Sequence, residues 1–163
     1  MNVFFVDRDP IVAAQQLCDV HVVKMAVESA QILSTARRHL GLDAPYRSTH
    51  PKHPCVLWVG QGVENYCWLL SHTRALCEEY TYRYGKRHGT EDKLDAFVEL
   101  PSALPSQWTE PAQAMPDEYK RLDPVEAYRA FYHHKAATLP RFGYRNRLAP
   151  SWLKNAPRGF EEV

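Results

Sequence analysis

Three side chains that could carry out proton or amine chemistry lie on one face of a predicted helix. His21, Lys24 and Glu28 are three and four residues apart, which aligns them along a helix axis. A carboxylate can act as an acid or a base, and an amine beside it can act as a nucleophile. The pattern predicts a working site formed by Glu28, Lys24 and His21, our candidate catalytic residues, in which partial desolvation would lower the pKa of the lysine and raise that of the glutamate.

The surroundings of these residues differ from those of a common surface helix. Apolar residues cover most of the predicted helix between positions 19 and 36, and Gln31 and Thr35 continue the polar line. Burying Lys and Glu is costly unless they are paired. We interpret the segment as a central helix whose polar edge faces a cleft. The alternative is an ordinary salt bridge between Lys24 and Glu28, next to a core histidine.

A second group of polar residues lies between positions 50 and 58. His50, His53 and Cys55, together with Cys18 and His21, are residue types that bind zinc. Their spacing matches no zinc motif known to us, so we favour a turn that brings Trp58 to the core. We expect no metal and no other cofactor. Lys52 and His53 are expected to line the mouth of the cleft.

The C-terminal part of the chain is locally basic, although the net charge of the whole chain is only +1. From position 135 onward the chain has six basic residues and only two acidic ones. The basic residues are Lys135, Arg141, Arg145, Arg147, Lys154 and Arg158, and the acidic ones are Glu161 and Glu162. Aromatic residues alternate with them, a composition typical of surfaces that hold phosphates and stack on bases. A solvated tail anchored by its aromatic residues is the alternative.

Several classes of protein have no support in the sequence. Motifs of P-loop nucleotide hydrolases, dinucleotide-binding folds, nucleophile-elbow hydrolases and zinc proteases are absent. The apolar residues 2–6 are too few for a signal core or a membrane span. The four cysteines lie in apolar patterns, which favours reduced, buried thiols. We expect a cytoplasmic protein without a membrane partner.

The predicted elements are almost all helical. Asp9-Pro10 and Asp123-Pro124 have the form of helix starts, Asp19 is a further candidate cap, and Gly41 and Gly85 are candidate helix ends. The expected helices cover residues 10–17, 19–40, 63–84, 91–100 and 124–138. Residues 2–6 are expected to be extended or a lone strand, 41–54 a loop, 55–60 an apolar turn, and 101–124 a proline-rich loop without regular structure. We predict an all-α fold that forms a single compact helical domain over residues 1–163. Its central helix covers residues 19–40, it has a long proline-rich loop, and its C-terminus is irregular, basic and aromatic.

Several stretches resemble small phage-encoded proteins of undefined role. They are residues 18–25 (CDVHVVKM), 28–36 (ESAQILSTA), 53–55 (HPC) with Trp58, 65–69 (NYCWL), 79–80 (EY) with 83–86 (RYGK), and 114–120 (AMPDEYK). More distantly, the layout resembles the phage pyrimidine-dimer DNA glycosylase and AP lyase family. In that family a histidine precedes a catalytic glutamate by seven residues, as His21 precedes Glu28. The proline, apolar run and glycine from Pro54 to Val63 and the basic C-terminus are similar too.

This resemblance implies a specific mechanism. The family's nucleophile is the N-terminal amine left after methionine removal, which attacks the sugar C1′ and forms a Schiff base while the glutamate moves protons. A base is flipped out of the duplex. This chain departs from the pattern because the bulky Asn2 disfavours removal of Met1. Two candidate amines follow, the N-terminal one and Lys24; otherwise the fold has kept DNA binding and lost or changed its chemistry.

The leading interpretation is a DNA-binding protein, glycosylase- or AP lyase-like, that acts on or recognises a damaged or modified base in double-stranded DNA. Its expected DNA contacts are Arg141, Arg145, Arg147, Lys154, Lys52 and His53. One alternative is a phage enzyme that modifies a flipped pyrimidine. Another is a non-enzymatic interaction module that uses the proline-rich loop. A phage-encoded protein would work in the host cytoplasm, and the oligomeric state does not follow from the sequence.

Overall fold

The computed structural model describes residues 1–153, and within them every regular element is helical. The α-helices are α1 (Pro10–Gln15), α2 (Asp19–His39), α3 (Pro54–Val59), α4 (Val63–Tyr84) and α5 (Pro124–Thr138), and the 3₁₀ segments are η1 (Gly89–Phe97), η2 (Asp117–Tyr119) and η3 (Ser151–Leu153). The predicted all-α fold class is therefore confirmed. None of the helices in residues 1–153 is long and apolar enough to cross a membrane.

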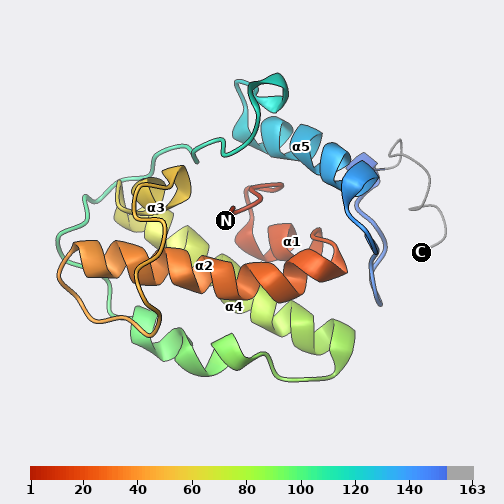
Figure 1. The fold of residues 1–163 in the computed structure, drawn as a ribbon. Helices are drawn as coiled ribbons and strands as arrows, with labels where there is room; N and C mark the ends of the chain where they lie inside the picture. Colours follow the sequence, from red (N-terminus) through yellow and green to blue (C-terminus); the bar gives the residue numbers. More distant parts are fainter. Residues whose placement is uncertain (154–163) are drawn as a thin grey trace.

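The two long helices, α2 and α4, pack against each other at the centre of the molecule (Figure 1). Helix α1 packs on α4, and α3 packs on both long helices. Helix α5 and η1 lie at opposite ends of the view in Figure 1, and the N-terminus lies in the interior of the arrangement. Large aromatic side chains fill the core, among them Trp58, Tyr66, Tyr128 and Tyr132.

Local signals located several helix ends correctly. Helix α4 covers the predicted residues, and Gly85 ends it in the left-handed conformation with φ of 68°. Asp123 caps α5 by accepting a hydrogen bond from the backbone nitrogen of Val125 at 3.1 Å. Asp9 caps α1 in the same way. These ends follow from the residues beside them, which is why sequence reasoning found them.

Three predictions about local structure were wrong. Residues 55–60 form a helix, α3, instead of a turn, because the imidazole of His53 caps it and Pro54 starts it. For residues 2–6 the lone-strand alternative is wrong, since they form an irregular segment, but the segment is buried as expected. Asp19 is the first residue of α2 and not its cap, since its carboxylate instead accepts hydrogen bonds from Arg83 and from the backbone of Arg145.

Smaller differences concern the short elements and the surface of α2. The predicted helix at 91–100 is the 3₁₀ segment η1, and η2 interrupts the loop predicted to lack regular structure. The irregular C-terminal part includes η3. On α2, Val20 and Val23 are exposed by 37% and 39%. The central helix is therefore not buried on all sides, because nothing covers these two valines within residues 1–153.

Two buried histidines make stability depend on pH. Burial lowers the pKa of His72 to about 4. The hydrogen bond between its Nδ1 and the Pro10 carbonyl, 2.9 Å away, acts in the opposite direction but does not outweigh the burial. Burial, and then the charges of Lys135 and Lys24, lower the pKa of His21 to about 3. Both histidines stay neutral in the folded protein at pH values where the unfolded chain takes up protons. Their contribution to stability is therefore complete above pH 6.5 and is lost as the pH falls towards 4.

We expect the free energy of unfolding to fall by about 2 kcal/mol per buried histidine between pH 7 and pH 5. Urea unfolding at the two pH values measures this loss. A His72→Asn variant retains an amide nitrogen near the position of Nδ1 but cannot titrate, so its loss should be smaller by about 2 kcal/mol. An equal loss in the variant and the parent would contradict the assignment to His72.

Candidate active site around the Met1 amine

The amino group of Met1 lies against the carboxylate of Glu28. Its nitrogen is 3.1 Å from Glu28 Oε1, and the two side chains are only 5% and 15% exposed. An amine this close to a shielded carboxylate has the arrangement that covalent catalysis requires of a nucleophile and its base. The polar line on α2 thus meets the start of the chain.

Lys24 approaches the same carboxylate from the solvent side. Its Nζ lies 3.7 Å from Glu28 Oε2, and its side chain is 62% exposed. Glu28 Oε2 is itself buried and makes no hydrogen bond within the described part of the chain. The i,i+4 salt bridge considered as an alternative is therefore present, but it is the weaker of two ion pairs. One oxygen of Glu28 is occupied by the Met1 amine and the other can still accept a proton.

The side chain of Asn2 holds the first residues in place. Its Oδ1 accepts hydrogen bonds from the backbone nitrogens of Val3 at 2.7 Å and Phe4 at 2.9 Å. Its Nδ2 donates to the carbonyl of Ala114 at 2.9 Å. Phe4 adopts φ of 43°, a conformation that is strained for a residue with a side chain. Asn2 therefore anchors Met1 to the proline-rich loop.

His21 is a buried member of this site. Its ring stacks on Phe4 with a centroid separation of 4.4 Å, and its Nδ1 lies 2.8 Å from the Tyr132 hydroxyl. The ring is 3% exposed and stays neutral at physiological pH because of its low pKa. It supports the floor of the site through packing and one hydrogen bond, as the core-histidine alternative expected.

His53 belongs to the same region and is half-buried. Its Nδ1 accepts a hydrogen bond from the Cys55 backbone nitrogen at 3.0 Å, so the neutral ring carries its proton on Nε2. Burial lowers the pKa of His53, and the positive Met1 amine and His50 lower it further, whereas the Met1 backbone and Glu28 act in the opposite direction. The start of α3 therefore brings an imidazole near the Met1–Glu28 pair, while Lys52 remains exposed.

The zinc alternative has no support in the geometry. Within residues 1–153 no three His, Cys, Asp or Glu side chains come together as metal ligands. Cys55 is buried, and burial raises the pKa of its thiol to about 12, which disfavours the thiolate that a metal would need. The four cysteines are unpaired thiols.

An open hollow of about 260 Å³ lies beside the Met1 amine, between the N-terminal segment, α2 and α5. Apolar side chains of Phe4, Met25, Phe131 and Leu139 form part of its wall. Other residues lining it are Met1, Asn2, His21, Lys24, Ala114 and Lys135. Of the predicted polar line on α2, His21 and Lys24 line this hollow, whereas Glu28 does not line it and contacts Met1 instead.

The basic C-terminal residues are largely engaged with the protein itself. Arg147 donates two hydrogen bonds to the buried Glu79, both at 2.9 Å, and lies over the ring of Tyr82. The guanidinium of Arg145 lies over the ring of Tyr84, 5.0 Å from its centre. Arg141 is exposed and has φ of 58°. Lys154 lies outside the described residues.

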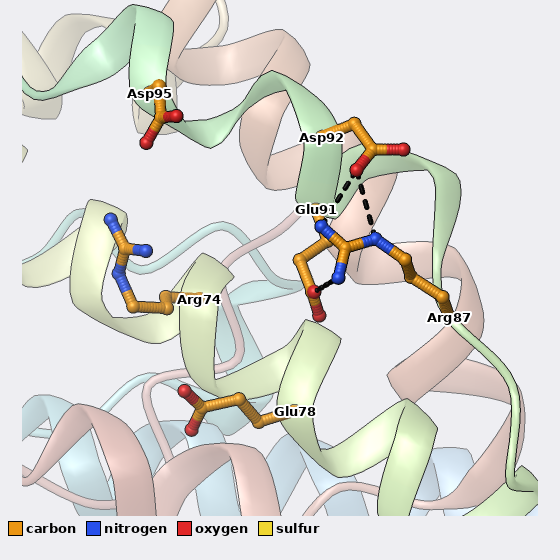
Figure 2. Close-up of a pocket in the computed structure, with 6 residues that line it drawn as sticks. All are labelled: Arg74, Glu78, Arg87, Glu91, Asp92 and Asp95. Carbon is orange, nitrogen blue, oxygen red and sulfur yellow. Dashed lines mark hydrogen bonds and ion pairs between the residues drawn. The ribbon is translucent and has the colours of Figure 1, made fainter.

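A second hollow, of about 320 Å³, lies between α4 and η1 (Figure 2). Its lining is entirely charged and consists of Arg74, Glu78, Arg87, Glu91, Asp92 and Asp95. Arg87 is held by Glu91 and Asp92, as the dashed lines in Figure 2 mark. Four carboxylates against two guanidinium groups leave this surface negative, which makes it unsuited to a polyanion such as DNA.

Several residues of the Met1 site were not singled out in the sequence as site residues. Four of them come from two segments more than 100 positions apart, namely Asn2 and Phe4, and Phe131 and Lys135. The sequence indicated only that Phe131 and Lys135 lie close together, because they are one helical turn apart on the predicted helix of 124–138. Nothing local indicates that this turn lies across from α2.

A scan against protein-family models matches residues 1–92 to the pyrimidine dimer DNA glycosylase family. Because the match covers more than half of the chain, the protein belongs to this family. The matched part contains Met1, His21, Lys24, Glu28 and His53, whereas α5 lies beyond it. Searches of curated proteins and of solved structures give no match. The family supports a glycosylase-like function on DNA and confirms the resemblance seen in the sequence.

Proposed function

We propose that this protein is a DNA glycosylase and AP lyase that uses the amine of Met1 as its nucleophile and Glu28 as its acid–base residue. The observation that carries the proposal is the 3.1 Å contact between the Met1 nitrogen and Glu28 Oε1 beside an open hollow. Membership of the pyrimidine dimer DNA glycosylase family supports DNA as the substrate class, and the substrate that we propose is damaged double-stranded DNA. Lys24 is the less suitable amine because it is largely exposed to solvent.

The chemistry follows from the positions of these groups. The neutral Met1 amine attacks C1′ of an abasic deoxyribose, forming a C1′–N bond while a proton passes to the carbonyl oxygen. Loss of that oxygen as water leaves the Schiff base, and Glu28 accepts and returns the protons involved. On a nucleotide that still carries its damaged base, the amine also attacks C1′. The bond from C1′ to the base then breaks, and the base leaves with the bonding electrons.

Borohydride trapping on duplex DNA with an abasic site tests the proposal. We expect a covalent adduct, and mass spectrometry of its peptides should locate the bond on Met1. A Lys24→Ala variant should still form the adduct, whereas protein extended by a Gly-Ser pair before Met1 should not. The intact mass of the protein shows at the same time whether Met1 is present.

The remaining outcomes separate the alternatives. An adduct on Lys24 would overturn the assignment of the nucleophile. Salt-sensitive DNA binding without any adduct would favour recognition or modification of a base. Absence of DNA binding would favour a protein-interaction role.

A further inference from the structure

Two lysines line the hollow beside Met1. Lys24 projects from α2 and Lys135 from α5, and both act on the pKa of the buried His21 between them. Lys24 has a partner in Glu28. Lys135, by contrast, forms no ion pair with any of the described carboxylates. Its ammonium lies 5.1 Å from the centre of the Phe131 ring, a cation–π contact that fixes its position at the wall.

The charge of this hollow suits an anion. Three amines belong to residues lining the hollow, those of Met1, Lys24 and Lys135, and among the carboxylates of residues 1–153 Glu28 alone is paired with any of them. Two positive charges remain next to an apolar wall. The predicted phosphate contacts near the C-terminus differ in this respect, since Arg147 is already bound to Glu79. Free positive charge therefore lies at the hollow and not at Arg147.

We infer that Lys135 is a phosphate-binding residue that holds the DNA backbone at the hollow lined by Met1. The inference rests on the proposed function for its ligand, a nucleic-acid phosphate. Lys135 touches no reacting atom and is a positioning residue. It lies on α5, outside the residues matched by the family model. DNA enters, on this view, between α2 and α5.

Binding to a duplex that carries a tetrahydrofuran abasic analogue tests the inference without any amine chemistry, because this analogue has no aldehyde carbon. Fluorescence anisotropy over a range of salt concentrations gives the affinity and its salt dependence. For Lys135→Ala we expect affinity to fall about 5- to 20-fold and the slope of log K against log [salt] to lose about 0.9 in magnitude, the value for one phosphate contact. Lys135→Arg should restore most of the affinity.

Lys93 provides the matched control. It is exposed on η1, and its ammonium lies 5.6 Å from the centre of the Tyr46 ring, an arrangement like that of Lys135 on Phe131. Lys93→Ala should bind as the parent does. An unchanged affinity and slope in Lys135→Ala, or an equal loss in Lys93→Ala, would overturn the inference, as would a parent protein that does not bind the duplex.

Trapping on a true abasic site separates this inference from the proposed function. With protein in saturating excess, Lys135→Ala should form the adduct at the parent rate, because the defect lies in binding. A slower rate at saturation would show that Lys135 acts in the chemical step and would overturn the positioning role. Absence of an adduct in the parent, together with the expected Lys135 effect on binding, would refute the proposed chemistry while supporting the phosphate contact.

Discussion

Glu28→Gln is expected to slow adduct formation with abasic DNA by about 100- to 10,000-fold, the range that general acid–base catalysis contributes. Glutamine retains the shape of the side chain and can still accept a hydrogen bond from the Met1 amine. It cannot take up or return a proton, so the proton transfers that accompany formation of the Schiff base lose their acid–base group. Single-turnover borohydride trapping measures the rate.

The size of this effect depends on the folded state being intact, which circular dichroism and thermal unfolding can show. Glu64→Gln is the matched control, because Glu64 is an exposed carboxylate on α4 and forms no ion pair within residues 1–153. It should trap at the parent rate. Trapping by Glu28→Gln at the parent rate would remove Glu28 from the mechanism, whatever the fate of the Met1 amine.

Glu79→Ala is expected to lower the free energy of unfolding by about 3 kcal/mol, because it removes one of the two carboxylates paired with the buried Arg83, which keeps Asp19, and also the carboxylate that binds Arg147. Glu79 is 4% exposed and accepts hydrogen bonds from Arg83 Nε at 2.7 Å and from Arg147. The Arg83 side chain is fully buried. Although burial raises the pKa of Glu79, its bonds to Arg147 and Arg83 outweigh this and lower the pKa.

Urea unfolding at neutral pH measures this loss. Glu78→Ala, at the exposed neighbouring position on α4, should change stability by less than about 0.5 kcal/mol. Below the melting transition Glu79→Ala should trap abasic DNA at the parent rate, since Glu79 does not line the Met1 hollow. A stability equal to that of the parent would mean that water compensates the two arginines and that the cluster does not fasten the C-terminal segment.

Glu28 could be recognised from the sequence, whereas Glu79 could be recognised only from the tertiary structure. Glu28 was recognisable in the sequence because Lys24 precedes it by four residues and His21 by seven on an apolar helix. Glu79 was not, because its i,i+4 partner Arg83 looks like any surface pair. Only the packing of the C-terminal segment on α4 buries that pair and adds Arg147.

The sequence by itself determined the elements whose signals are local. Helix α4 with its glycine end, α5 with its Asp-Pro start and the polar line on α2 all depend on residues within four positions of one another. The tertiary structure alone decided that the Met1 amine meets Glu28, that Asn2 donates a hydrogen bond to Ala114, and that Lys135 and Lys24 line the same hollow. These contacts depend on the angles at which helices pack and on the path of a long proline-rich loop. Many weak contacts set both, and none of them is encoded in the residues that meet at the site.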